Sequence, residues 1–227
     1  MERREAPIVH RVERATSTQR TARDYIELGA ARAGHVIVAD EQTAGRGRQG
    51  REWLSPVGGF YATFVVPHDR LIAVRAGVAV LRAVANLSIP VGLKWPNDLM
   101  IEGRKLGGIL IETARDLALV GVGLNVETRP LPDSVSLLDF GLCVERLALV
   151  QAIYADLAMP RSDDELLSLY RACLTTLGQT VRMDRGTNAD EVIGIAVDID
   201  SSGCLVVETD SGRTTLAAGD CVHLSPQ

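Results

Sequence analysis

Three arginines lie among glycines in the stretch EQTAGRGRQGREW, residues 41–53 of this 227-residue chain. Arg46, Arg48 and Arg51 carry planar guanidinium groups, each of which can hold a phosphate or a carboxylate through two hydrogen bonds. The glycines between them let the backbone approach an anion closely. The stretch predicts a loop that closes over an anionic ligand, with a solvated surface loop of unpaired charges as the alternative.

The glycines of the same stretch, Gly45, Gly47 and Gly50, spell the G-x-G-x-x-G pattern of a dinucleotide-binding turn. Such a turn follows a strand directly and opens a helix. Residues 54–59 contain a proline and two glycines, which prevent a helix of useful length. The surrounding elements also favour hairpins over strand–helix–strand units, so we reject a dinucleotide-binding fold.

The composition excludes several classes of protein. Apolar residues make up 46% of the chain, enough for a buried core, and a net charge of −5 gives no field that attracts nucleic acid or anionic lipid. The four cysteines and four histidines show no metal-binding spacing. The N-terminus lacks the apolar segment of a signal peptide, and the longest apolar run, 71–87, is interrupted by polar residues. We expect a cytoplasmic protein that contacts no membrane and has no metal site of its own.

The hydrophobic pattern predicts an α+β fold for the first 179 residues. The predicted strands are 35–40, 59–66, 91–95, 104–113 and 117–127, the last two forming an antiparallel hairpin. Helices are expected over 17–33 and 71–87, and two more after a proline-containing connection at 129–136. The second of these begins with a capping box at Ser162–Glu165 and is expected to end at Gly178.

The pattern changes at Thr180 to short β segments separated by glycine and serine turns. The segments are TVRMD, EVIGIAVDID, CLVVETD, TTLAAGD and CVHL. They predict a small β-barrel, which gives two domains, residues 1–179 and residues 180–227.

Four motifs together resemble those of the biotin protein ligases, in the family's order and spacing. They are GRGRQGR (45–51), LKWPNDLM (93–100), RKLGGILIE (104–112) and GVGLNV (121–126), with TST (16–18) and SLLD (136–139) also fitting. The resemblance extends from about residue 10 through the β-rich tail. It implies a mixed, largely antiparallel central sheet flanked by helices, as in class II synthetases, plus an SH3-like C-terminal β-barrel.

The resemblance implies a reaction in two steps. Biotin first attacks the α-phosphate of ATP, with Mg²⁺, to give biotinyl-5′-AMP and pyrophosphate. A lysine of a biotin carboxyl carrier protein or domain, of acetyl-CoA or a related carboxylase, then takes the biotinyl group. Because two anions must meet in the first step, cationic positioning is expected to dominate catalysis.

The resemblance also implies the residues that carry out this chemistry. The catalytic residues would be Arg48, Lys105 and Asp98, with Asp98 holding Mg²⁺ indirectly or helping to deprotonate the acceptor lysine. The expected biotin contacts are Ser17, Thr18, Gln19, Gln42, Arg46, Gly47, Arg48, Lys105 and Gly107. The expected ATP or adenylate contacts are Arg48, Arg51, Trp53, Lys94, Asn97, Lys105 and Asn125.

Some of these residues have a plain structural alternative. Ser17 and Thr18 are also suited to cap a helix, Asn97 to satisfy its own turn, and Trp53 to pack in a loop. Gln19 stands where the family usually has asparagine.

Two other functions stay open at this point. A lipoate–protein ligase shares the architecture and the adenylate chemistry but lacks the combination of GRGRxGR and KWPND. A biotin or biotinyl-AMP sensor without catalysis has no need for both Arg48 and Lys105.

Only about fifteen residues precede Ser17, too few for a helix-turn-helix domain, so we expect no DNA binding. A homodimer is compatible with the sequence.

Overall fold

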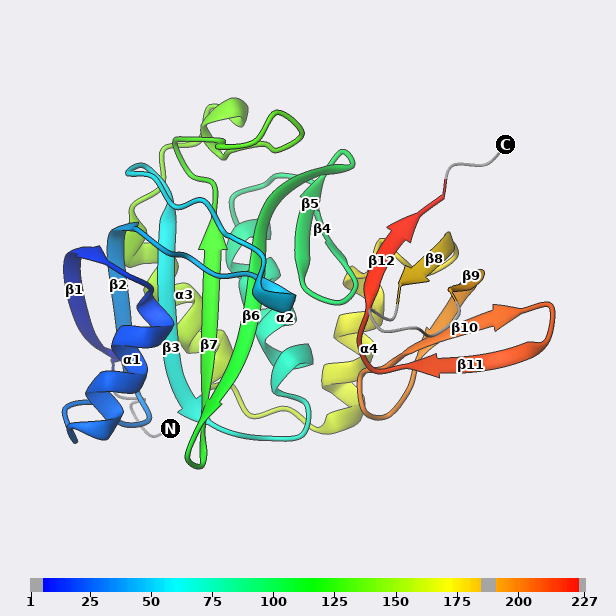
Figure 1. Ribbon diagram of the computed structural model, residues 1–227, viewed down its shortest axis with the longest axis horizontal. Helices are drawn as coiled ribbons and strands as arrows, with labels where there is room; N and C mark the ends of the chain where they lie inside the picture. The colour runs from blue at the N-terminus through cyan, green and yellow to red at the C-terminus, as the bar shows by residue number, and fades with distance from the viewer. Residues whose placement is uncertain (1–5, 185–190, 225–227) are drawn as a thin grey trace.

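A computed structural model of the chain describes residues 6–184 and 191–224. Figure 1 shows a large sheet with its helices beside a smaller C-terminal sheet. The strands of the large sheet are β1 (Ile8–Ala15), β2 (His35–Gln42), β3 (Phe60–Pro67), β4 (Val91–Lys94), β5 (Asp98–Ile101), β6 (Arg104–Ala114) and β7 (Leu117–Leu124). The α-helices are α1 (Thr18–Glu27), α2 (Ile72–Ala85), α3 (Arg146–Leu157) and α4 (Asp163–Cys173). Short 3₁₀ turns lie at Arg48–Gly50 and Leu138–Phe140.

The large sheet has the strand order β1-β2-β3-β7-β6-β5-β4. β1 pairs with β2 in parallel, and the other neighbouring strands pair antiparallel. This confirms the mixed, largely antiparallel sheet and the hairpin of β6 and β7. β1 is not among the strands that the sequence predicts, and with α1 and β2 it forms one strand–helix–strand unit at the edge of the sheet.

The two faces of the large sheet bury separate hydrophobic clusters. On one face, α1 packs Ala22 and Ile26 against Ile37, Val65 and Leu119 of the strands. On the other face, α2, α3 and α4 cover a much larger cluster that contains alternate residues of the same strands. Because alternate strand residues point to opposite faces, this pattern produces a three-layer domain in which α1 covers only part of its face.

Two helices end at least five residues earlier than the sequence predicts, and α2 ends at Ala85 instead of residue 87. α1 stops at Glu27, where Gly29 adopts a left-handed conformation with φ 71°, so the predicted extension to residue 33 is wrong. α4 begins as predicted, with Ser162 Oγ accepting from the Glu165 amide, but it ends at Cys173 and not at Gly178. The chain beyond it turns extended, and the Thr175 amide donates to the Leu93 carbonyl at 2.8 Å. That contact covers the outer edge of β4, which explains why the helix stops.

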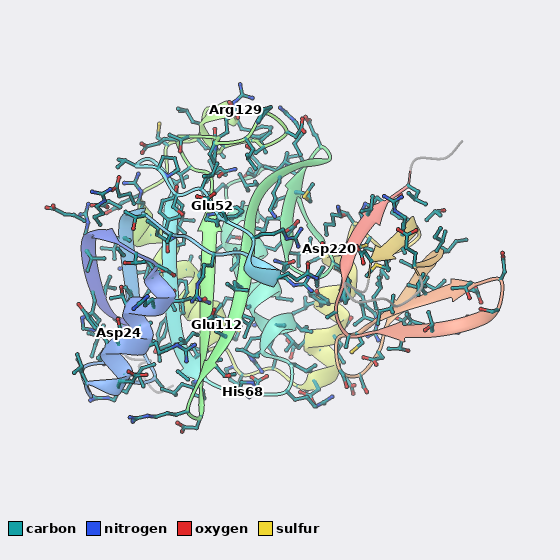
Figure 2. All side chains as sticks on the ribbon, in the orientation of Figure 1. Asp24, Glu52, His68, Glu112, Arg129 and Asp220 are labelled. Carbon is teal, nitrogen blue, oxygen red and sulfur yellow. The ribbon has the colours of Figure 1, made fainter. Side chains whose placement is uncertain are left out.

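The C-terminal residues form a five-stranded antiparallel sheet in the order β11-β10-β9-β8-β12. Its strands are β8 (Thr180–Asp184), β9 (Val192–Ile199), β10 (Leu205–Thr209), β11 (Gly212–Leu216) and β12 (Asp220–His223). Each predicted segment contributes a strand, although β11 begins before TTL, and AAG lies outside the strands. Figure 2 shows Asp220, at the start of β12, where this sheet meets the large one. None of the helices in the described ranges has the length and apolar character needed to cross a membrane.

Candidate active site

A cavity of about 360 Å³ opens on the face of the large sheet that α1 only partly covers. Its walls come from the start of α1, the loop between β2 and β3, the turn between β4 and β5, strands β6 and β7, and the start of β12. The predicted site residues that line it are Ser17, Thr18, Gln19, Gln42, Arg46, Gly47, Arg48, Arg51, Trp53, Lys94, Asn97, Asp98 and Lys105. Two predicted residues, Gly107 and Asn125, lie elsewhere.

A hydrogen-bonded network fixes the base of the arginine loop. Gln42, the last residue of β2, accepts from the Thr18 amide at 2.8 Å and donates to Ser55 Oγ at 2.8 Å. Between these residues the chain folds back tightly, and a side chain at Gly45 would place its Cβ 2.4 Å from the Trp53 carbonyl. No helix follows the glycines except the 3₁₀ turn at Arg48–Gly50, which agrees with the rejection of a dinucleotide fold.

The α1 end of the cavity is lined by buried, neutral polar groups. Ser17 occupies the N-cap position of α1, yet its side chain makes no capping hydrogen bond within the described residues. Gln19 is 3% exposed and donates from Nε2 to the Leu110 carbonyl at 2.8 Å, whereas its Oε1 has no partner among the described residues. Gly121 makes room for it, because a Cβ there would lie 2.7 Å from Gln19 Nε2. This end suits an uncharged ligand with hydrogen-bonding groups.

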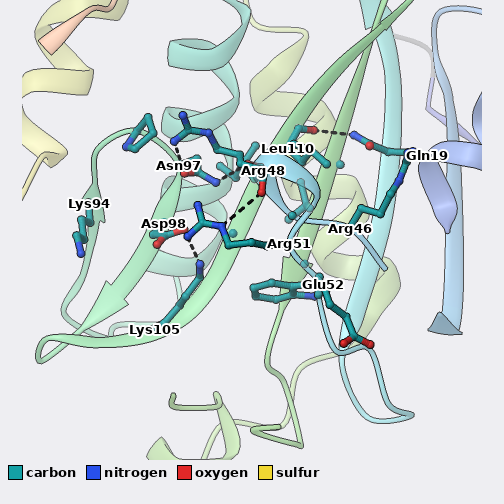
Figure 3. A pocket seen from close by; sticks show the side chains of 18 of the residues that line it. Gln19, Arg46, Arg48, Arg51, Glu52, Lys94, Asn97, Asp98, Lys105 and Leu110 are labelled. Atoms are coloured by element: carbon teal, nitrogen blue, oxygen red, sulfur yellow. Dashed lines mark hydrogen bonds and ion pairs between the residues drawn. The ribbon is translucent and has the colours of Figure 1, made fainter. Parts of the chain in front are cut away.

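A lysine and an aspartate face each other across the middle of the cavity. Lys105 Nζ lies 2.7 Å from Asp98 Oδ1, as Figure 3 shows. The β4–β5 turn that carries Asp98 contains a cis bond at Trp95–Pro96 and is held to β6, since Asn97 Nδ2 donates to the Ile109 carbonyl at 2.9 Å. Asn97 therefore has a structural role, and its Oδ1 also accepts from Arg48 at 3.3 Å.

A β-bulge decides which glycine of the RKLGG motif faces the cavity. Opposite β5, Met100 pairs with Lys105 and Leu99 pairs with Gly107, so Leu106 is the extra residue. The bulge brings Lys105 and Gly108 to the same side, and a Cβ on Gly108 would lie 3.7 Å from Lys105 Cε. Gly107 packs instead against β7, where a Cβ would lie 2.4 Å from Leu124 Cδ2. Gly108 takes the place in the cavity wall that the sequence prediction assigned to Gly107.

The C-terminal sheet closes the cationic side of the cavity. Arg48 Nη1 donates to the Gly219 carbonyl at 3.2 Å, and Arg51 Nη2 lies 2.5 Å from Asp220 Oδ1. Burial lowers the pKa of Arg48 from its ordinary value, an effect opposed by the nearby carboxylate of Asp220. The ordinary pKa of an arginine lies far above neutral pH, so Arg48 stays charged despite its burial. Nothing in the sequence signals that Asp220, Cys221 and Val222 line this cavity, because it depends on how the two sheets meet.

Trp53 lies between this cavity and a second one. Its indole covers Gly123, where a Cβ would lie 2.5 Å from Nε1, and Lys105 Nζ is 5.4 Å from the ring centroid. The second cavity, of about 210 Å³, shares Trp53 and Lys105 with the first and is lined also by Asn125 and Leu131. Asn125 is buried and donates to the Val135 carbonyl at 3.0 Å.

The remaining predicted residues that line the cavity are Arg46, Gly47 and Lys94. Arg46 extends toward β6, where it pairs with Glu112 at 3.2 Å, and the Gly47 amide donates to the Arg51 carbonyl at 2.7 Å. Lys94 ends β4 beside the C-terminal sheet. Within the described residues, no group of three or more histidine, cysteine or acidic side chains is arranged to hold a metal.

Comparison with known proteins identifies the family. Residues 11–127 match the biotin/lipoate A/B protein ligase family, and residues 176–224 match the biotin protein ligase C terminal domain. A biotin–[acetyl-CoA-carboxylase] ligase of Mycobacterium tuberculosis is 39% identical, over 86% of this chain and 81% of the relative. The bifunctional ligase/repressor BirA of Bacillus subtilis is 28% identical, over 90% of this chain and 70% of the relative.

Solved structures of similar proteins contain biotin, ATP or biotinyl-5-AMP. The biotin protein ligase of Aquifex aeolicus in complex with biotin and ATP superposes with a TM-score of 0.80 at 27% identity, covering 95% of this chain and 97% of that one. The ligase of Leishmania major in complex with biotinyl-5-AMP gives 0.68 at 28% identity, covering 93% and 99%. The chain belongs to the biotin/lipoate A/B protein ligase family. Within it, the match of the C-terminal sheet and the similar ligases define its activity as that of a biotin–[acetyl-CoA-carboxylase] ligase.

Proposed function

We propose that the cavity binds biotin at its α1 end and the phosphates of ATP at its arginine end, so that the two react beside Lys105. The observation that carries this assignment is the division of a single cavity. Neutral, buried polar groups line it at α1, Arg48 and Arg51 line it beside the C-terminal sheet, and Lys105 lines the same cavity. The biotin ureido ring needs hydrogen bonds without charge, whereas a triphosphate needs cations.

The first step joins the biotin carboxylate to the nucleotide. A carboxylate oxygen forms a bond to the α-phosphorus, and the bond from that phosphorus to the pyrophosphate oxygen breaks. Lys105 is suited to lie between the two anions because its ammonium is a compact charge. To do so it exchanges its contact with Asp98 for the ligand oxygens. Arg48 and Arg51 stabilise the charge that develops on the leaving pyrophosphate.

We place the adenosine at Trp53 and Asn125, in the second cavity. Its sharing of Trp53 and Lys105 with the first cavity supports this, because a nucleotide has to extend from the reacting phosphate to its base. The indole provides a surface for stacking.

Mg²⁺ fits this arrangement as an ion carried by the nucleotide. It keeps several waters and needs only one or two protein carboxylates besides phosphate oxygens, and Asp98 and Asp220 both line the cavity. When bound, it would neutralise phosphate charge during the first step.

The second step transfers the biotinyl group to a lysine of the biotin carrier domain of a carboxylase. The acceptor ammonium first gives up a proton to water. Its neutral nitrogen then bonds to the carbonyl carbon of the mixed anhydride while the bond from that carbon to the phosphate oxygen breaks, AMP leaves, and the second proton on nitrogen also passes to water. Asp98 is the carboxylate placed to orient that lysine, since it lies at the cavity wall and contacts Lys105. We divide the chain into a catalytic domain, residues 1–179, and a C-terminal domain, residues 180–227, that completes the phosphate end.

Isotope exchange between pyrophosphate and ATP tests the first step. The proposal predicts exchange that depends on biotin and Mg²⁺, without any carrier protein. A protein that only senses biotin would bind it and show no exchange. If lipoate supported faster exchange than biotin, the assignment of the neutral end of the cavity to biotin would be wrong.

A further inference from the structure

Glu112 of β6 holds two arginines from different elements and has no role in the steps described above. Its carboxylate lies 3.2 Å from Arg46 Nη2 in the arginine loop and 3.0 Å from Arg23 Nη2 in α1. Arg23 also donates to the Thr113 carbonyl at 3.0 Å, which fixes it on β6. Figure 2 shows Glu112 over the middle of the large sheet, well separated from Asp220. The carboxylate is 24% exposed, so water and salt screen these contacts only in part.

The two halves of the arginine loop are therefore held by different anchors. The half with Arg48 and Arg51 is held by Asn97 and by Asp220 of the C-terminal sheet. Within the described residues, Glu112 is the side chain that holds Arg46. When phosphates arrive, Arg48 and Arg51 turn to the ligand, whereas the anchor at Glu112 lies outside the cavity lining and stays in place.

The contact between Arg46 and Glu112 also affects the position of Trp53, whose indole separates the two cavities. Arg46 forms a β-bridge with Glu52, and the Trp53 amide donates to the Gly45 carbonyl at 2.9 Å. Fixing Arg46 on β6 therefore fixes the strand-like stem of the loop that carries Trp53. That stem and the neutral polar groups at the start of α1 line the same cavity.

We propose that Glu112 is a positioning residue that keeps the arginine loop closed over the biotin end of the cavity by holding Arg46. It contacts no substrate, and its effect is to retain biotin and biotinyl-AMP between the two steps. A closed loop has to open before a ligand leaves, so a weaker anchor raises the open population and the release rate. The chemistry in the closed state keeps all its groups. The inference rests on the proposed binding of biotin in this cavity.

Release of biotinyl-AMP tests the inference directly. The probe is radiolabelled biotinyl-AMP added to the full chain and chased with excess unlabelled compound, so that release is measured even if adenylation fails. Glu112→Gln keeps the shape and removes the charge, and we expect release about fivefold faster, as for a partly shielded ion pair. Pyrophosphate exchange at saturating biotin and ATP should change less than about twofold, since no group at the reacting atoms is altered. Failure of wild-type exchange would count against the proposed function and not against this inference.

A double-mutant cycle separates positioning from a merely structural effect. Arg46→Gln should speed release by a similar factor, and Glu112→Gln should add nothing further in the Arg46→Gln background. Arg23→Gln should leave release nearly unchanged, because Arg46 keeps its partner. Asp40→Asn is the matched control: Asp40 is 22% exposed and pairs with Arg11 at 3.1 Å, away from the cavity. Additive effects of Glu112→Gln and Arg46→Gln, or equal release from wild type and Glu112→Gln, would overturn the proposal.

Discussion

Gly107 and Gly108 are neighbours in one motif, yet they face opposite sides of β6. In an unbroken strand, alternate residues share a face, so Lys105 and Gly107 are expected to face the ligand together. The bulge at Leu106 shifts that alternation by one residue, so Gly108 joins Lys105. A bulge is set by the pairing with β5 and not by local residue type, so the motif alone does not indicate which of the two glycines lines the cavity.

Alanine at each glycine should therefore have a different consequence. Gly107→Ala places a Cβ 2.6 Å from the Gly123 carbonyl, and we expect a loss of about 2 kcal/mol in the free energy of unfolding. Gly108→Ala meets its neighbours at ordinary contact distances of 3.6 Å or more, so stability should hold while KM rises for biotin or ATP. Urea unfolding and steady-state kinetics measure the two effects. An unstable Gly108→Ala with unchanged KM would show that the register given for β6 is wrong.

Lys105 should matter more for the reaction than for binding. In Lys105→Ala the neutral contacts of the α1 end stay, whereas the charge between the two anions is lost. We expect pyrophosphate exchange to fall by about 100-fold or more, as for loss of one electrostatic catalytic group, with a much smaller change in biotin affinity. Isothermal titration with biotin alone gives the second quantity. Equal losses in both would remove Lys105 from the role given to it.

At the scale of elements, local patterns predict most of the strands but miss β1. Its sequence IVHRVERA carries charged residues on an exposed edge, and seven of its eight residues are not buried. Charged side chains on an edge strand protect it from pairing with other chains. They also interrupt the alternation of apolar and polar residues from which a strand is predicted. The capping box of α4 shows the opposite case, because a local hydrogen bond fixes that helix start. Its end depends on the distant contact with Leu93 and is not predictable locally.

The packing of α3 on α2 depends on a buried carboxylate. Asp156 accepts from Arg82 Nε of α2 at 3.0 Å and from Arg161 Nη2 at 2.9 Å, and the Arg161 side chain is 2% exposed. Asp156→Ala leaves a buried arginine without its counter-charge, and we expect a loss of about 3 kcal/mol in stability. Glu208→Gln, at an exposed pair with Arg213, is the control and should change stability by less than about 1 kcal/mol. Similar midpoints for both variants in urea unfolding would contradict this.

At the scale of the whole molecule, the site is completed by contacts between the two sheets. The motif identifies the arginines of the loop, but their partners Gly219 and Asp220 lie about 170 residues further along the chain. No periodicity or spacing links segments so distant, and the contact follows only from the position of β12 beside the large sheet. The residues of the first 179 that line the cavity are thus largely predictable, whereas their contacts in the C-terminal sheet are not.

Stability of the whole chain should decrease in mild acid because of a buried histidine. His35 is buried, its Nδ1 lies 2.9 Å from His10 Nε2, and burial lowers its pKa with help from His10 and Arg32. As the pH falls, the imidazole in the unfolded chain therefore takes up a proton near pH 6.5, before His35 of the folded protein does. The stability that neutral His35 contributes is present above about pH 6.5 and is lost as the pH falls through the pKa of the folded state. His35→Gln should show a flatter decline over that window in pH-dependent urea unfolding. A parallel decline in wild type and variant would exclude His35 as the cause.

The central claim is that one cavity carries out both steps with Lys105 between the anions. The most direct measurement is the mass of a biotin carrier domain after incubation with the protein, ATP, Mg²⁺ and biotin. We predict a gain of one biotinyl group on a single lysine, abolished by omitting ATP and nearly abolished in Lys105→Ala. An unchanged mass with wild type, or the same gain with Lys105→Ala, would contradict the account.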